Sequence, residues 1–316
     1  MRWLFKQNGG IVMQWIREAS PDPQRRRLYR RAMWITLGGN LWLTLSKGVV
    51  AYLSGSAALY ADAANSTADL LYSVLMVLGL WVAQRPPDAS HPQGHSRFEP
   101  LVGLMVGLAM GFAGFEAART SVERFVAGGL AVEPGLPTLV LLASAAVKVG
   151  MFLVIRRLAQ RLTSPTLNAA ARDNLTDVLT SAAALVGTLG SAYVHPLLDP
   201  VAGFLVALWI FRAAYEVGQE NLAYLTGAGA DLELRRALAE TASNVSGVQR
   251  VHQIITEYAG PRLVADLHIN VDGNLTLYEA HAISDAVQAK LEALPDVDRA
   301  YVHMEPCEKD AAISGG

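Results

Sequence analysis

Long apolar segments, separated by short polar stretches, fill the first two thirds of the chain. A helix needs about 20 mostly apolar residues to cross a bilayer, and the segments that meet this length number six. They run approximately over residues 32–53, 57–84, 100–124, 136–158, 166–192 and 198–218. The pattern therefore predicts an α-helical membrane protein with six transmembrane helices, a transport domain over residues 32–220, and a cytoplasmic tail over residues 1–31.

Positively charged residues gather at one end of the predicted helices. They precede the first span and lie between spans two and three and between spans four and five: Arg25, Arg26, Arg27, Arg30, Arg31, Arg85, Arg97, Arg156, Arg157 and Arg161. Loops on the cytoplasmic side of a membrane carry the excess of Lys and Arg. We therefore expect a multi-pass protein of the cell (inner) membrane, with both termini in the cytoplasm.

The pattern changes after about residue 220, where the composition becomes that of a soluble domain. Period-2 and helical patterns predict helix, strand, strand, helix and strand. Their bounds are Asp231–Val245, Val251–Tyr258, Arg262–Val271, Thr276–Leu294 and Ala300–Glu305. The sequence therefore predicts a small α+β (αββαβ) cytoplasmic domain over residues 221–308, followed by a disordered tail over residues 309–316.

The composition excludes several classes of protein. The 316 residues are 52% hydrophobic and 17% charged, whereas soluble proteins carry about 25% charged residues. The single cysteine, Cys307, excludes an intramolecular disulfide and a thiolate metal cluster. The sequence contains no phosphate-binding loop of the type G-x-x-x-x-G-K-[ST]. We therefore expect a gradient-driven transporter in the lipid bilayer that is not an enzyme and has no nucleic-acid partner.

Two of the predicted spans carry polar residues one helical turn apart. Asn65 and Asp69 lie in the second span, and Asp173 and Asp177 lie in the fifth. Residues four apart share a helical face, and a charged carboxylate in hydrocarbon costs a few kcal/mol or more. A divalent cation between the two helices would compensate this charge, because oxygen ligands from both pairs would surround it.

Intramembrane acids can also serve without a bound metal. Lys47 and Lys148, in spans one and four, could pair with one or two of these acids. The acids could instead form a proton relay. Asp62, one turn before Asn65, could pass protons or line an outer vestibule, or it could be a packing acid bonded to a hydroxyl such as that of Ser56.

Several motifs occur together along the chain. Residues 55–69 read GSAALYADAANSTAD, residues 91–99 read HPQGHSRFE, residues 171–177 read ARDNLTD, and the sixth span opens with Asp199-Pro200. Together with the C-terminal α+β domain, this combination resembles the cation diffusion facilitator family from about residue 30 to residue 306. The resemblance implies a transport site at Asn65, Asp69, Asp173 and Asp177. It also implies a homodimeric exporter that works by alternating access and exchanges cytoplasmic metal for protons.

The four residues of this transport site offer only oxygen ligands. Zinc-selective members of the family carry histidine at the position of Asp173, and often another in the second span. Imidazole suits zinc, copper and nickel, whereas carboxylate and amide oxygens suit manganese, magnesium and calcium. The set resembles the manganese-exporting branch of the family, so Mn(II) is the predicted cargo, with Zn(II), Fe(II) and Co(II) as alternatives.

A second candidate metal site lies between the second and third spans. Asp88, His91 and His95 are spaced three and then four residues apart, which matches the loop-borne metal site of the family. A simple turn is the alternative, because Pro92 and Gly94 favour one and histidine spacing in a loop does not determine ligand geometry.

The predicted cytoplasmic domain holds four of the seven histidines, His252, His268, His281 and His303. Glu305 lies two residues after His303 on a predicted strand, so the two share a face. These positions match those at which family members bind regulatory metal. The hypothesis is that a divalent metal here tightens the dimer and biases the transport domain, and the alternative is that the histidines are solvated surface residues.

The third span carries Gly103, Gly107 and Gly111 at a strict spacing of four. Small residues at this spacing let helices approach closely. The stripe therefore predicts a packing face, either between the subunits of a dimer or within one protomer.

Two functions of another class also fit a polar site in a membrane. A metal channel would conduct without proton coupling, and a membrane-anchored metal sensor would bind metal without transmembrane flux. The matched pairs in spans two and five argue against a sensor, because a sensor needs no site inside the membrane.

Overall fold

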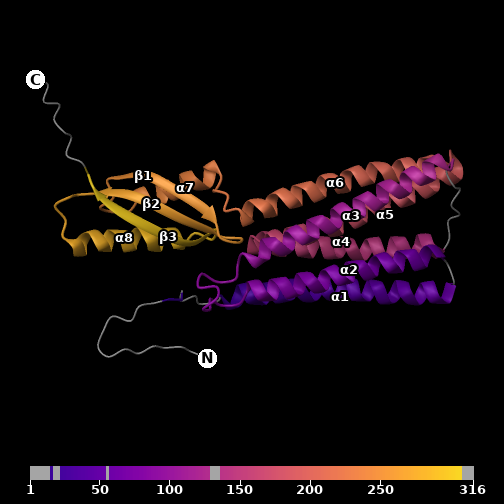
Figure 1. The fold of residues 1–316 in the computed structure, drawn as a ribbon, viewed down its shortest axis with the longest axis horizontal. Helices are drawn as coiled ribbons and strands as arrows, with labels where there is room; N and C mark the ends of the chain where they lie inside the picture. Colours follow the sequence, from indigo (N-terminus) through magenta and orange to yellow (C-terminus); the bar gives the residue numbers. More distant parts are fainter. Residues whose placement is uncertain (1–14, 17–21, 55–56, 129–135, 308–316) are drawn as a thin grey trace, which may run out of the picture. The chain divides into compact units, whose positions relative to one another are not determined.

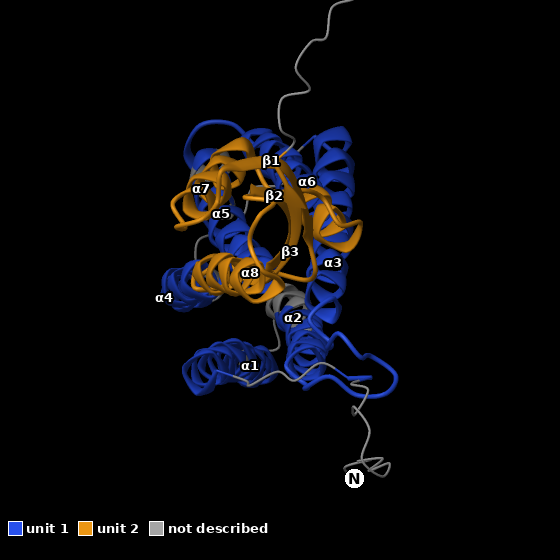
Figure 2. Cartoon of the chain, turned by 90° about the vertical axis from the view of Figure 1, so that its left-hand side faces the viewer, with its two compact units in different colours: residues 1–218 blue, residues 219–316 orange. Residues whose placement is uncertain are grey.

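The computed structural model describes residues 15–16, 22–54, 57–128 and 136–307. The chain forms two compact units, residues 1–218 and residues 219–316 (Figure 2). The predicted disordered tail, residues 309–316, lies outside the described residues, as does most of the segment before residue 22.

Long helices make up the first unit, and they run alongside one another (Figure 1). They are α1 (Pro23–Ser54), α2 (Ala57–Ala83), α3 (Phe98–Val126), α4 (Leu136–Leu162), α5 (Pro165–Tyr193) and α6 (Leu198–Leu225), the last of which continues into the second unit. Each predicted span falls on one of these helices. By length and composition, three described segments are apolar enough to cross a membrane: Ser66–Ala83, Phe98–Val126 and Leu198–Leu225. The helical transmembrane class is therefore confirmed, and the count of six spans stays a prediction.

Local sequence determines where α5 begins. The Ser164 side chain accepts a hydrogen bond from the backbone N–H of Leu167, and Pro165 occupies the first turn. A hydroxyl at this position pairs one of the N–H groups that a helix leaves free at its start, and proline lacks the N–H that would otherwise need a partner. The start of α5 is thus set eight residues before Asp173.

A buried polar group joins three helices near this start. The Glu99 side chain, in the first turn of α3, is 3% exposed. Its carboxylate accepts hydrogen bonds from the Tyr29 hydroxyl at 2.9 Å and from the Ser164 hydroxyl, and the Thr166 hydroxyl donates to the Glu99 carbonyl. The apolar core around it includes Leu80, Ile155, Leu162 and Leu167. The group therefore links α1, α3 and the beginning of α5.

The glycine stripe of α3 packs against α6 within the protomer. A Cβ atom added at Gly107 would lie 3.0 Å from the Val217 side chain, and one at Gly114 would lie 3.0 Å from Ile210. At Gly111 the nearest atom would be the Ala214 Cβ, at 3.9 Å. Gly107 and Gly111 of the stripe thus lie on an intraprotomer packing face, because their absent side chains leave room for α6.

The second unit contains a three-stranded sheet with two helices. Its elements are α7 (Leu232–Ser243), β1 (Arg250–Tyr258), β2 (Leu263–Val271), α8 (Leu277–Glu292) and β3 (Val297–Pro306). Strand β2 is central, antiparallel to β1 and parallel to β3. The predicted order αββαβ is confirmed, with ends that differ by a few residues.

Strand β2 separates the two faces of this sheet. Leu263, Ala265, Leu267, Ile269 and Val271 are buried in the core that also holds Leu238 of α7 with Val287 and Leu291 of α8. The alternating residues Asp266, His268 and Asn270 are exposed or partly exposed. Both helices therefore cover one face, and the histidine of β2 lies on the other.

Candidate metal centres

Carboxylates from α2 and α5 meet at the ammonium group of Lys148 on α4. Lys148 Nζ lies 3.0 Å from Asp69 Oδ2 and 2.6 Å from Asp177 Oδ2. The lysine side chain is 6% exposed. The structure thus brings together acids that lie far apart in the sequence, because both contact the same buried cation.

Asp173 lies one turn before Asp177 and faces the same space. Asp69, Asp173 and Asp177 all line a cavity of about 500 Å³ between α2, α3, α5 and α6. Asn65 and Asp62 lie on α2, but their side chains fall outside the part of the chain that the structure describes. Three of the four predicted transport residues can therefore be located, and they surround one region.

The same cavity extends to the end of α3 and the start of α6. There it is lined by Arg124 and Asp199, whose side chains form an ion pair at 3.0 Å. These helix ends lie on the side that the arginine distribution predicts to be outside the cytoplasm. The cavity thus connects the buried acids with a helix end that carries its own ion pair.

Lys148 partly neutralises the acids of this cavity. The pairing of a lysine with intramembrane acids, predicted as an alternative to metal binding, is present, and the partners are Asp69 and Asp177. One ammonium carries a single charge, whereas three carboxylates line the cavity beside it. The cavity is therefore lined by more carboxylates than the two that Lys148 contacts.

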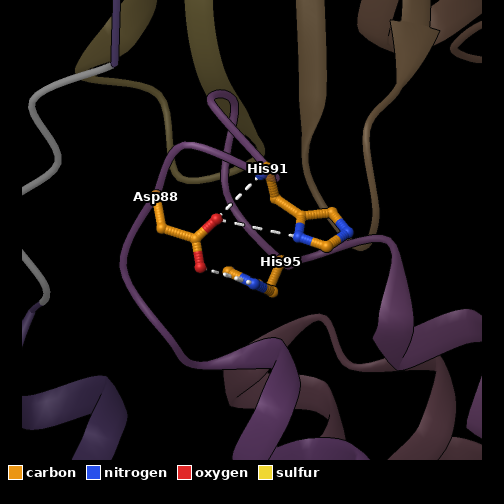
Figure 3. Close-up of side chains that lie close together, drawn as sticks. All are labelled: Asp88, His91 and His95. Carbon is orange, nitrogen blue, oxygen red and sulfur yellow. Dashed lines mark hydrogen bonds and ion pairs between the residues drawn. The ribbon is translucent and has the colours of Figure 1, made fainter.

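Asp88, His91 and His95 come together between α2 and α3 (Figure 3). Asp88 Oδ1 lies 3.8 Å from His91 Nδ1, and Asp88 Oδ2 lies 3.5 Å from His95 Nε2. One potential ligand atom from each residue lies within 4.8 Å of the others. Among the described residues, the buried Nδ1 of His95 has no hydrogen-bond partner. The three side chains are therefore close enough together to hold one metal ion between them.

The same carboxylate also holds a turn. Asp88 Oδ1 accepts hydrogen bonds from the backbone N–H groups of His91 at 2.8 Å and Ser90 at 2.9 Å. The His91 hydrogen bond lowers the pKa of the Asp88 carboxyl below its ordinary value, because such bonds favour the charged form. Turn and cluster therefore occur in the same loop, and Asp88 is ionised at neutral pH.

In the second unit, Glu305 of β3 lies among histidines from all three strands. Glu305 Oε1 is 3.2 Å from His268 Nδ1 and 3.7 Å from His303 Nε2, and its Oε2 is 3.4 Å from His252 Nε2. The parallel register pairs His268 with His303 on β2 and β3. The sheet irregularity between Val251 and Gln253 falls at His252, and bulges redirect side chains. Register and bulge together create the cluster.

The structure adds one residue to this group and leaves one outside. Asn270 Oδ1 lies 3.0 Å from His252 Nδ1; its only signal in the sequence was the polar face that it shares with His268. His281, by contrast, lies on α8 and pairs with Asp285 at 3.7 Å. Because α8 covers the opposite face of the sheet, His281 is not brought to Glu305.

These features define a membrane transporter of metal cations, since acids line a cavity among long apolar helices and a histidine-bearing α+β unit follows. Comparison with family models agrees with this class. Residues 33–226 match the cation efflux transmembrane domain, and residues 230–307 match the cytoplasmic domain of cation efflux proteins. The chain belongs to the cation efflux, or cation diffusion facilitator, family. It is therefore a metal cation efflux transporter and not an enzyme, as predicted.

Relatives of known sequence span nearly the whole chain. An uncharacterized transporter of Methanocaldococcus jannaschii is 34% identical over 279 residues, covering 88% of this chain and 99% of the relative. The manganese efflux system protein MneS of Bacillus subtilis is 29% identical, with coverages of 87% and 94%. A solved structure of a MamM C-terminal domain variant is 29% identical and covers 25% of this chain and all of that domain, with a TM-score of 0.24.

Proposed function

We propose that this chain exports Mn(II) from the cytoplasm in exchange for protons, by alternating access through a site formed by Asn65, Asp69, Asp173 and Asp177. The observation that carries the proposal is the convergence of Asp69 and Asp177 on one buried cation position beside Asp173. A carrier needs such a position between helices that can move relative to one another. The cavity toward Arg124 and Asp199 supplies a route from this position to one end of the bundle.

The choice of manganese rests on the oxygen-only ligand set. Carboxylate and amide oxygens suit Mn(II), whereas Zn(II) takes imidazole readily. The 29% identity to a manganese efflux protein supports the same choice. Zn(II), Fe(II) and Co(II) are the alternative cargoes, and Asp173→His should shift the preference toward zinc if ligand type decides selectivity.

Flux into proteoliposomes tests the site and the metal together. Asp69→Ala and Asp173→Ala should abolish Mn(II) flux, whereas Glu123→Gln, an exposed change on α3, should leave it intact. Wild-type flux in both aspartate variants would remove the proposal. Zinc transport clearly faster than manganese transport would overturn the cargo, and flux that needs no pH gradient would favour a channel. Binding without flux would favour a sensor.

The proposal includes a homodimer in the cell membrane with both termini in the cytoplasm. Residues 32–220 would form its transport domain and residues 221–308 its regulatory domain. The exposed Cys307 offers a direct test of topology, because it is the single cysteine. A membrane-impermeant maleimide should label it in inside-out vesicles and spare it in intact cells, and the reverse labelling would refute the orientation.

We further propose that the cluster of His252, His268, His303 and Glu305 binds a regulatory divalent metal. The short distances from Glu305 to three imidazoles support this role. The loop cluster of Asp88, His91 and His95 is a second candidate site. His281 is left out of the proposed regulatory site, because it lies on α8 beside Asp285. Asp62 is proposed to pass protons or line the vestibule.

Calorimetric titration of the full chain can isolate these sites. In an Asp69→Asn/Asp173→Asn background, any remaining micromolar binding of Mn(II) or Zn(II) comes from outside the transport site. Adding His268→Ala and Glu305→Gln should remove one binding event, and adding Asp88→Asn and His95→Ala should remove another. Absence of saturable binding in the background protein would retire both sites.

A further inference from the structure

The proposed transport site contains a positive charge of the protein's own. The Lys148 ammonium contacts the oxygens Asp69 Oδ2 and Asp177 Oδ2 at 3.0 and 2.6 Å. These oxygens belong to different helices, α2 and α5, and both side chains line the cavity. Lys148 itself comes from a third helix, α4, so its ammonium bridges the two ligand-bearing helices.

A purely structural ion pair accounts poorly for this arrangement. A buried ion pair usually stabilises a protein no better than well-packed apolar residues of similar volume would. An intramembrane ionisable group is a functional candidate by default. Here the lysine contacts the same two acids that are proposed to bind the cargo, and both acids also line the cavity.

We propose that Lys148 is an internal competitor of the transported metal, so that the ammonium and the metal ion bind the same carboxylate oxygens in turn. This inference rests on the proposed transport site. Entry of a doubly charged ion displaces the ammonium from Asp69 and Asp177. Return of the ammonium to these oxygens then favours release of the metal.

The chemistry of lysine suits this exchange. Its ammonium is a compact charge with three donors on a flexible four-carbon stem. It can therefore leave the carboxylates by rotation about side-chain bonds, without movement of the α4 backbone. A carrier with three carboxylates and no competing charge would hold a divalent ion tightly and release it slowly, so the competitor raises turnover at the expense of affinity.

The test compares metal affinity with the maximal transport rate in matched variants. Lys148→Gln should bind Mn(II) at least tenfold more tightly, by titration of purified protein, and should transport at least tenfold more slowly at saturating metal. Lys148→Arg keeps the charge and should return the dissociation constant to within threefold of wild type. Ser144→Ala, one turn away on α4, removes a buried hydroxyl that bonds the Val140 carbonyl and should change neither quantity.

A purely structural role for Lys148 predicts the opposite change in Mn(II) affinity, because a disturbed site binds metal more weakly. Unchanged or weaker Mn(II) binding in folded Lys148→Gln would overturn the inference. Lys148→Met, with a side chain of similar length and no charge, repeats the measurement independently of how one variant folds. Mn(II) binding to Asp69→Asn is measured in parallel. Wild-type affinity in Asp69→Asn would refute the transport site itself. Lost binding in Asp69→Asn, together with unchanged affinity in the Lys148 variants, would refute only the role of Lys148 as a competitor.

Discussion

Replacement of Glu99 by alanine should strongly destabilise the helical unit. This carboxylate is buried where α1, α3 and α5 meet, and it accepts hydrogen bonds from the hydroxyls of Tyr29 and Ser164. Alanine would leave both hydroxyls without an acceptor in a buried site. It would also weaken the start of α5, because Ser164 caps that helix.

The size of the effect follows from these two bonds. A buried donor left without a partner costs about 1–3 kcal/mol, so the two hydroxyls together amount to about 2–6 kcal/mol. A domain of this size loses about 2–4 °C in Tm for each kcal/mol, and the expected fall in Tm is on the order of 10 °C. Glu99→Gln keeps an acceptor oxygen at the same length and should lose about half as much.

Thermal unfolding of the purified protein in detergent, followed by tryptophan fluorescence, measures this difference. Glu123→Ala is the matched control, because it removes an exposed glutamate near the other end of the same helix. Melting of Glu99→Ala within about 2 °C of this control would refute the role of the buried carboxylate, since one such hydrogen bond would already cost more.

Three further predictions concern other parts of the chain. Thr276→Ala removes the side-chain cap of α8 and should destabilise the second unit by about 1 kcal/mol in chemical unfolding. The Thr276 hydroxyl lowers the pKa of Glu279, so the part of the cap that this carboxylate supplies is fully present above the carboxyl's ordinary pKa and is lost as pH falls through the lowered value; the difference between wild type and variant should therefore become smaller in acid. Gly107→Leu should lower Tm by overpacking α3 against α6, at about 1–3 kcal/mol, whereas Gly111→Ala, with 3.9 Å to its nearest neighbour, should be tolerated; equal melting of the two would contradict the packing. Chelation of bound metal should lower Tm, because a ligand present at 100 times its Kd stabilises the folded state by about 2.7 kcal/mol, and a chelator shift as large in Glu305→Gln as in wild type would place the responsible metal elsewhere.

The fold was predictable because its signals are local. The length of each apolar segment marked the helices of the first unit, and α2 begins at the predicted residue. Period-2 alternation identified the strand that the structure places at Leu263–Val271. The Asp88, His91 and His95 cluster was also predictable, since these residues lie within one short loop and a tight turn must bring them close.

Contacts between segments that are distant in the sequence could not be predicted in this way. Helical periodicity showed that Asp173 and Asp177 share a face, but it carries no information about which helix that face meets. Lys148 was one of two candidate lysines in the sequence, and only helix packing placed its ammonium between Asp69 and Asp177. In the same way, the glycine spacing on α3 predicted a close approach, while the structure decided that the partner is α6.

The second unit shows the same division. The sequence by itself placed four histidines and Glu305 on particular strands and a helix, because strand and helix periods are properties of neighbouring residues. The strand register and the irregularity at His252 then decided that three of the histidines surround Glu305 while His281 lies beside Asp285. Pattern determines the direction in which a side chain leaves its own element. Which groups finally meet depends on how the elements pack, and only the tertiary structure determines that.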